Sequence, residues 1–458
     1  MTVPRPTRRT ARWVSRAAVA LTSTWLTAGA SSADAVSPQE RGASCGVFAR
    51  PEVPPTPEGP FQVGTTSVVL TTQSMDRAGL MFPDGNIGVL RLPGAARYSI
   101  WGASGSFGGV GRWAGLPNGT YKFEGTLESI AAAREGGRTA AALMQGSSEP
   151  SPDGSDFDRD YAGGGPTYVI SLNGPTASSH SSAAARTTPI LLQIYHGEFN
   201  AIPGRGQLAY GGSGLAISRD EGRTFRKIGQ ILAPHVGRDE FFGARTRGGL
   251  WADASMIEAD ARGHRVSAPN ASSQERERFD YLIFTDHNQV DEACGGLSLA
   301  RVRTGELLVG VTEERAPHFL KFYQHGPAGS WQAGDFSEPG IGGRSTLVVG
   351  VSREFVNSPS IGYDSWLGLY VLAYQVNQKQ VRISTSSDLL HWSAPQMIAA
   401  AEQDSPTRLF YPSVVGSGED PADLGRSFFV FFLMRERDTQ GRFSNPRLLR
   451  VRLDAPAH

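Results

Sequence analysis

A short β-rich segment recurs five times along this chain, and the repetition constrains the fold more than any other feature. Each copy is too short for a helix and is rich in β-branched and aromatic residues, which is typical of a buried central strand. The copies lie at residues 98–101, 191–195, 281–284, 369–374 and 428–433. Five copies of one supersecondary unit indicate a repeat architecture.

Each copy is followed, after a turn, by a stretch that alternates apolar and polar residues, at 121–123, 214–218, 297–301, 381–384 and 448–453. A leading strand precedes the later copies, at 251–257, 358–361 and 411–415. Three strands per copy and one outer strand make a blade. The sequence therefore predicts an all-β fold, a five-bladed β-propeller of four-stranded antiparallel blades. Six blades or a two-sheet sandwich remain open alternatives.

The first residues resemble an export signal. Five arginines between residues 5 and 16 precede a modestly apolar stretch at 17–30, and Ala33-Asp34-Ala35 supplies a small-residue exit. We expect a signal peptide at 1–35, a Pro-rich tether at 36–60 and the propeller at 61–458, with a Ser/Gly/Pro/Asp-rich insertion at 146–188 that contains one strand. The mature protein is then secreted or periplasmic. A membrane anchor is the alternative, but a spanning helix needs about 20 apolar residues.

Charge and cysteine content narrow the partners. Lys plus Arg and Asp plus Glu both number 44, and no long run of one sign occurs, which disfavours nucleic acid and anionic membranes as partners. We expect a monomer without a membrane span. Cys45 and Cys294 are too far apart in sequence for a C-x-x-C redox or zinc motif. They are a candidate disulfide, and two unrelated thiols are the alternative.

Two turn motifs carry family resemblance. Residues 218–225 read Ser-Arg-Asp-Glu-Gly-Arg-Thr-Phe and resemble the aspartate box of sialidases, in which Ser and Asp side chains bind backbone N–H groups of a hairpin. We interpret it as a fold marker. Residues 386–393, Ser-Ser-Asp-Leu-Leu-His-Trp-Ser, resemble a segment of five-bladed glycosidases such as arabinanases, xylosidases and fructosidases, and the strand at 367–374 has the same style.

That resemblance implies glycoside hydrolysis by carboxylates at the inner ends of the blades. Two carboxyl groups beside the scissile bond are the minimum for this chemistry. By position, Asp76 is the candidate base, Glu198 the candidate acid and Asp253 the candidate orienting residue. Glu198 departs from the family order, because the family's acidic Glu begins a leading strand. Each of the three has a structural alternative as a turn cap, a solvated loop residue or an acceptor of backbone N–H groups.

Three further residues are candidate sugar contacts. His196 and His287 follow two different central strands, so in a propeller both would face the central channel, where a histidine binds an ion or sugar hydroxyls. Trp101 offers an indole face for stacking on a sugar ring, with core packing as its alternative. We expect no cofactor. A structural calcium ion at Asp153, Asp156, Asp158 and Asp160 is the alternative to a solvated loop there.

The sequence thus favours a secreted glycoside hydrolase-like protein whose partner is an oligo- or polysaccharide. A sialidase-type enzyme is one alternative, since the aspartate box is complete, although a single full box occurs. A non-catalytic carbohydrate-binding propeller is another, because the family's acid position carries no carboxylate at 357–359.

Overall fold

The computed structural model describes residues 58–78, 82–92, 95–104, 119–128, 153–170, 189–199, 210–243, 249–266, 277–287, 295–324, 334–350, 354–418, 420–439 and 443–457. All of them belong to one compact unit that starts at Ser44. The predicted signal peptide, most of the tether, and both Cys45 and Cys294 lie outside these residues. Those predictions remain untested.

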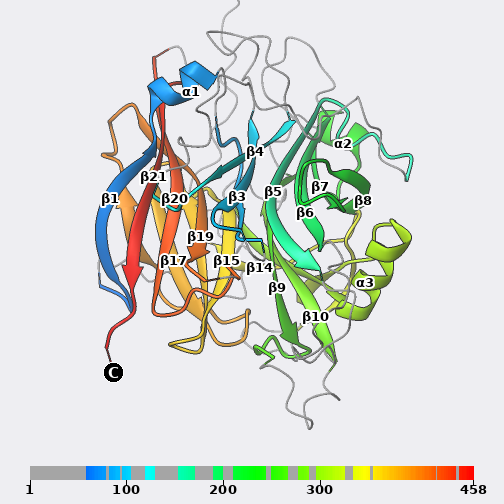
Figure 1. Ribbon diagram of the computed structural model, residues 1–458. Coiled ribbons are helices and arrows are strands. Elements are labelled where there is room, and N and C mark those ends of the chain that lie inside the picture. Colours follow the sequence, from blue (N-terminus) through cyan, green and yellow to red (C-terminus); the bar gives the residue numbers. More distant parts are fainter. Residues whose placement is uncertain are drawn as a thin grey trace, which may run out of the picture. The chain divides into compact units, whose positions relative to one another are not determined.

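The described strands form five antiparallel sheets, and each sheet is one blade (Figure 1). Blade one contains β2 (Gly88–Leu90), β3 (Tyr98–Ser104) and β4 (Gly119–Gly125). Blade two contains β5 (Tyr161–Ile170), β6 (Ile190–Phe199), β7 (Tyr210–Ser218) and β8 (Arg226–Leu232). Blade four contains β15 (Val356–Asp364), β16 (Leu369–Val376), β17 (Gln380–Ser386) and β18 (Gln396–Ala400).

Blade three is larger than the sequence predicts. It contains β9 (Gly249–Asp260), β10 (Arg278–His287), β11 (Gly295–Arg303), β12 (Leu320–Gln324) and β13 (Gly334–Pro339), and β14 (Leu347–Gly350) pairs with the start of β11. The helix α3 (Thr304–Glu313) follows β11 and buries Leu307 and Val311. A further short helix, α2 (Arg238–Gly243), follows β8.

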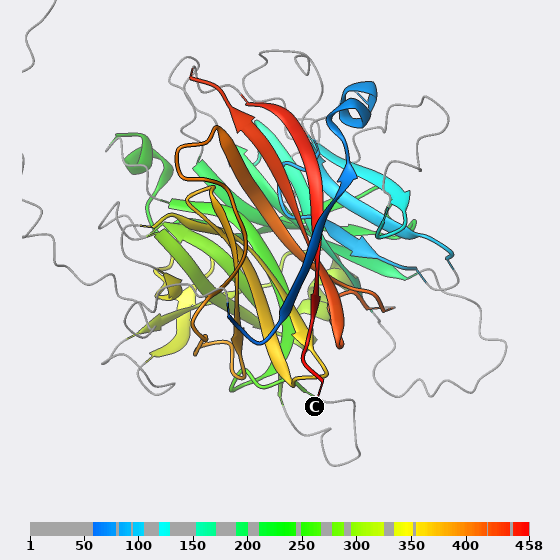
Figure 2. The ribbon, with the colours of Figure 1, turned by 90° about the vertical axis from the view of Figure 1, so that its left-hand side faces the viewer.

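Blade five is closed by the two ends of the described chain. Its strands β19 (Thr407–Gly416), β20 (Ser427–Arg437) and β21 (Phe443–Asp454) come from the C-terminal part. The outermost strand is β1 (Gln62–Leu70), which pairs antiparallel with β21. Figure 2 shows blue β1 running beside red β21. Helix α1 (Thr72–Ala78) comes directly after β1.

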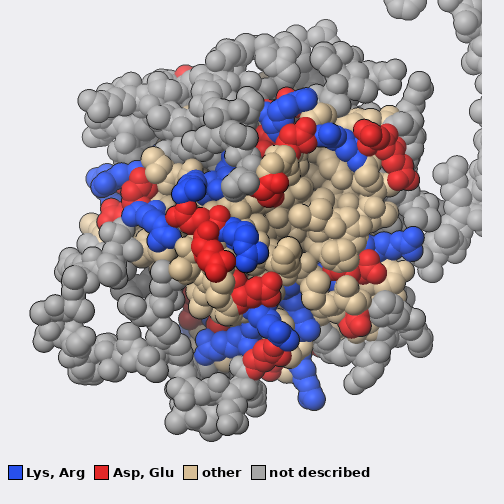
Figure 3. All heavy atoms as spheres, turned by 90° about the vertical axis from the view of Figure 1, so that its right-hand side faces the viewer, with Lys and Arg blue, Asp and Glu red and all other residues tan. Residues whose placement is uncertain are grey.

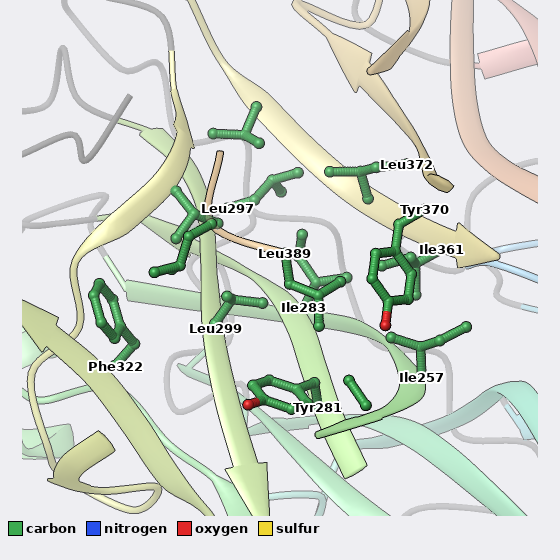
Figure 4. Close-up of a cluster of buried hydrophobic side chains, with 14 of the residues drawn as sticks. Ile257, Tyr281, Ile283, Leu297, Leu299, Phe322, Ile361, Tyr370, Leu372 and Leu389 are labelled. Atoms are coloured by element: carbon green, nitrogen blue, oxygen red, sulfur yellow. The ribbon is translucent and has the colours of Figure 1, made fainter. Parts of the chain in front are cut away.

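Five buried clusters fill the five interfaces between neighbouring blades, including the interface between blades five and one. Alternation along a strand sends successive side chains to opposite faces: Leu191 packs toward blade one and Leu192 toward blade three. Figure 4 shows the interface of blades three and four, where Tyr281 and Leu299 meet Tyr370 and Leu372. Because every interface is filled, the sheets close into a ring, and the predicted five-bladed propeller is confirmed.

The five recurring segments are the second strands of the five blades, β3, β6, β10, β16 and β20, and the alternating stretches are the third strands. The structure departs from the expectation at residues 146–188. Within them, β5 is the innermost strand of blade two rather than a strand set apart in an insertion.

Positive and negative side chains are interspersed on the face shown in Figure 3. None of the helices among the described residues has the length and apolar character that crossing a membrane requires.

Candidate active site

One position recurs near the start of each inner strand, and hydrogen bonds between blades identify it. The Ser255 hydroxyl accepts from the Ile361 N–H (3.2 Å), Ser360 from Val414 (3.0 Å), and Ser413 from Ile87 (3.0 Å). In blades four, five and one, the residue after this position donates to the preceding blade: Ile361 follows Ser360, Val414 follows Ser413 and Ile87 follows Asn86. Asn86 takes the serine's place in blade one.

Counting two residues back from these positions gives Asp253 in blade three, Ser358 in blade four, Tyr411 in blade five and Asp84 in blade one. In blade two the pairing of β5 with β6 is irregular between Gly164 and Thr167, as it is at 357–360 and 410–413 in blades four and five. This register places Gly165 at the recurring position. Five equivalent residues, one from each blade, therefore surround one end of the axis.

Glycine at 165 leaves the blade-two position without a side chain. The second strand β6 supplies side chains there instead, because His196 and Glu198 lie opposite Gly163 and Tyr161 in the ladder. A pocket is lined here by Gly85 and Asn86, residues 163–166 and 194–196, Asp253 and Ala254. The site thus combines two carboxylates from recurring positions, Asp84 and Asp253, with a histidine and a third carboxylate from β6.

Two of the recurring positions have unusual backbone conformations. Ser358 and Tyr411 have φ of 53° and 54°, although each is a non-glycine residue followed by proline. The left-handed conformation costs a non-glycine residue about 1–2 kcal/mol. Side chains of the preceding blade hold both N–H groups: Ser358 donates to Thr285 Oγ1 (3.0 Å) and Tyr411 to Gln375 Oε1 (2.9 Å).

This backbone conformation aims both hydroxyls at carboxylates. Ser358 donates to Asp253 Oδ2 (2.8 Å), and Tyr411 donates to Asp84 Oδ1 (3.1 Å). Strain that persists at two equivalent positions, each presenting a hydroxyl to a carboxylate of a neighbouring blade, is the kind found at functional sites.

His196 lies between two carboxylates. Its Nε2 is 3.2 Å from Glu198 Oε1, and its Nδ1 is 3.5 Å from Asp253 Oδ1. Burial by itself would lower the pKa of His196, but the hydrogen bonds and charges of Asp253 and Glu198 outweigh it and raise the pKa to about 10. An imidazole with this pKa is positively charged at neutral pH.

Asp84 has the opposite environment. Its side chain is largely enclosed by protein, and this burial raises its pKa. The charge of Arg435 opposes the increase and the charge of Glu198 adds to it. Arg435 is buried, with its guanidinium 4.1 Å from the ring centre of Phe410. The Tyr161 hydroxyl donates to the backbone carbonyl of Asp84 (3.2 Å).

The structure brings Glu198, Asp253 and His196 together, as the sequence predicts, but not Asp76. Asp76 is exposed on α1, which follows the outermost strand of blade five and packs against β21. Asp84, eight residues later, lies at the axis instead. Sequence reasoning missed Asp84 because Pro83-Asp84-Gly85-Asn86 has the composition of a turn. The signal that identifies Asp84 is its position two residues before Asn86, which corresponds to the position of Asp253 two residues before Ser255.

Trp101 and His287 fall in different places. The prediction of Trp101 as a sugar platform is wrong, because its side chain is 0% exposed between blades one and two. Its Nε1 donates to the Gly222 carbonyl (3.0 Å), and its ring meets Phe225 edge-on. His287 is the last residue of β10, and its side chain lies outside what the structure describes.

The two turn motifs join the third and fourth strands of blades two and four. Asp220 Oδ1 accepts from Ser218 Oγ (2.7 Å) and from the Thr224 N–H (2.9 Å), and Ser218 Oγ accepts from the Gly222 N–H (2.8 Å). In the second turn Asp388 accepts in the same way from the His391 N–H (2.8 Å). Both turns lie away from the pocket and serve the fold.

The four aspartates considered for calcium have separate partners. Asp153 accepts from the Gln230 N–H (2.9 Å), Asp156 pairs with Arg238 (2.6 Å) and Asp160 with Arg159 (2.8 Å). Asp158 forms a buried ion pair with Lys227 (2.8 Å). Across the described ranges, no group of three His, Cys, Asp or Glu side chains is arranged to hold a metal ion.

Comparisons with known proteins found similar solved structures but no matching family. The sequence matches no protein-family model, and the comparison with curated proteins likewise gave no match. A similar solved structure is the catalytic domain of the GH62 α-L-arabinofuranosidase of Coprinopsis cinerea, with 13% identity, 87% of this chain and 99% of that chain covered, and a TM-score of 0.44.

Two bacterial structures are also similar. The α-L-arabinofuranosidase of Lactobacillus brevis has 11% identity over 81% of this chain and 90% of its own, with a TM-score of 0.41. The GH43 endo-arabinanase of Bacillus licheniformis has 12% identity over 80% and 94%, with a TM-score of 0.38.

Proposed function

We propose that this protein is a secreted glycoside hydrolase that cleaves glycosidic bonds of an extracellular glycan, with Asp84, Glu198 and Asp253 as its carboxyl groups. The observation that carries the proposal is their convergence at the axis, although they are distant in sequence: Glu198 and Asp253 both contact His196, and the charge of Glu198 acts on Asp84. Secretion follows from the predicted signal peptide, and we propose that the mature chain acts as a monomer.

The electrostatics of the site support this reaction class. Glycoside hydrolysis needs one carboxyl group to protonate the leaving oxygen and a second, ionised one to assist attack at the anomeric carbon. Environments that push the pKa values of neighbouring carboxyl groups apart make both forms available at one pH. Burial raises the pKa of Asp84, whereas Glu198 and Asp253 lie beside the charged imidazole of His196.

A sialidase-type enzyme fits the site less well. That mechanism uses a tyrosine nucleophile and three arginines that bind the substrate carboxylate. The charged neighbours that influence Asp84 and Tyr411 include one arginine, Arg435. Burial raises the pKa of both axial tyrosines, Tyr161 and Tyr411, well above the usual value, which opposes nucleophilic attack by either oxygen.

The test is hydrolysis by the purified protein of a panel of aryl glycosides and polysaccharides that includes arabinosides, xylosides, fructosides and sialosides. We expect cleavage of at least one non-sialoside substrate. Asp84→Asn, Glu198→Gln and Asp253→Asn should each lower the rate by about 100-fold or more.

The matched control is Asp76→Asn, which alters an exposed carboxyl group on α1 and should retain the wild-type rate. Tight glycan binding without turnover would instead select the non-catalytic binding propeller. Full activity in the three site variants would remove the assignment.

A further inference from the structure

The contacts of His196 fix where protons reside in the site. A neutral imidazole has one N–H donor and one acceptor nitrogen, so it can donate to a single carboxylate. Here both ring nitrogens face carboxylate oxygens, Nε2 toward Glu198 and Nδ1 toward Asp253. Only the doubly protonated ring donates on both sides. The geometry therefore requires either an imidazolium or a proton on one of the two acids.

The surroundings of Asp253 favour the imidazolium. Its Oδ2 accepts the Ser358 hydroxyl (2.8 Å) and its Oδ1 faces His196 Nδ1, so each oxygen has a partner that is able to donate to it. A protonated carboxyl group would have to donate at one of these contacts. The Asp253 side chain is 9% exposed, so an unpaired charge there would be costly. The imidazolium balances it.

Glu198 is the more open of the two acids, with 27% of its side chain exposed against 9% for Asp253. It therefore faces the solvent-accessible side of the charged cluster. The side chain of Asp84 accepts a hydrogen bond from the neutral hydroxyl of Tyr411. The groups that face Asp84 from the surrounding strands are Arg435, Glu198, Tyr411 and His196, together with Tyr161.

We propose that His196 is a positioning residue that stays protonated, holds Glu198 and Asp253 as carboxylates, and thereby leaves Asp84 as the proton donor of the site. This inference rests on the proposed glycosidase function and deepens it. It reverses the role that the sequence predicts for Glu198, which becomes the base.

The reaction balances with these roles. Asp84 transfers its proton to the glycosidic oxygen, the bond between that oxygen and the anomeric carbon breaks, and a water oxygen forms the new bond to that carbon. The proton lost by the water goes to Glu198. Exchange of one proton with solvent at each carboxyl group restores the starting state. His196 and Asp253 keep their protonation throughout.

The protonation of His196 can be measured without any substrate. In ¹⁵N-labelled protein, the ring signals of His196 are identified by their loss in His196→Gln. We expect both ring nitrogens to remain protonated above pH 8, since the pKa is raised to about 10. His264, whose side chain is exposed, supplies reference ring signals from the same sample. Loss of a ring proton from His196 below pH 8 would overturn the inference.

The roles of Asp84 and Glu198 are separated by leaving-group chemistry. A dinitrophenyl leaving group needs no proton, so Asp84→Asn should hydrolyse a dinitrophenyl glycoside within about tenfold of wild type while losing about 100-fold or more on a natural linkage. Glu198→Gln should lose activity on both substrates and regain it on the dinitrophenyl glycoside with added azide. The opposite pattern would overturn the assignment.

His196→Gln should lower kcat by about 10-fold or more and change the pH profile, with little effect on KM, because it removes the charge that fixes the base. His264→Gln should change neither. An unchanged pH profile in His196→Gln would contradict the positioning role. If wild-type protein cleaves no glycoside, the proposed function fails, while the ring titration still decides the charge of His196.

Discussion

Replacing Gly222 by alanine tests the packing of blade one against blade two. Gly222 has a φ of 72°, and a Cβ there would lie 2.4 Å from Trp101 Cζ2 and 2.7 Å from Trp101 Nε1. Trp101 cannot move aside easily, because it is fully buried and its Nε1 is bonded to the Gly222 carbonyl. Gly222→Ala should therefore incur both backbone strain and steric overlap.

Gly154 provides a matched control. Its φ is 75°, but a Cβ there would meet nothing within 4 Å. Gly154→Ala should cost about 1 kcal/mol for the left-handed backbone alone. Gly222→Ala should cost about 1–3 kcal/mol more, the usual penalty for overpacking a core. Urea unfolding, followed by tryptophan fluorescence, measures the difference. Equal losses in the two variants would refute the packing that we assign to Trp101.

Two buried charges give further predictions. Lys227→Met should lower the free energy of unfolding by about 3–5 kcal/mol, because it leaves Asp158 charged and buried. The double variant Lys227→Met/Asp158→Leu should recover most of that loss. Urea unfolding measures both. Burial raises the pKa of Asp280 to about 7, so its ionisation weakens the fold as pH rises from about 4 through 7. Asp280→Asn should then gain stability relative to wild type between pH 4 and pH 8, and a pH-independent difference in melting temperature would contradict this.

The sequence predicts the second and third strands of every blade because their side chains are buried and apolar on one or both faces. The first strand of each blade was harder to predict from the sequence. Those of blades three to five were found, whereas β5 begins Tyr-Ala-Gly-Gly-Gly-Pro, which has the composition of a loop. Glycines are needed there because a Cβ at Gly164 would lie 2.0 Å from Gln193 Oε1. Close approach between strands is a property of packing that local composition does not express.

The site, too, could be predicted only in part, because local composition does not express which residues meet in space. Glu198 and Asp253 follow recognisable strands, so the sequence could place them at the axis. Asp84 precedes a strand of three residues, β2, and its equivalence to Asp253 is visible only through the hydrogen bonds between blades. Trp101 was predicted as a sugar contact although it is buried, because the exposure of an aromatic ring depends on its neighbours in space.

Hydrolysis in ¹⁸O-labelled water is the most direct test of the central claim. The glycan that gives the highest rate in the panel is incubated with wild-type protein and with the double variant Asp84→Asn/Glu198→Gln, and the released sugar is analysed by mass spectrometry. We predict one labelled oxygen at the new reducing end with wild type and no labelled sugar above background with the variant. Labelled sugar produced by the double variant at the wild-type rate would contradict the site.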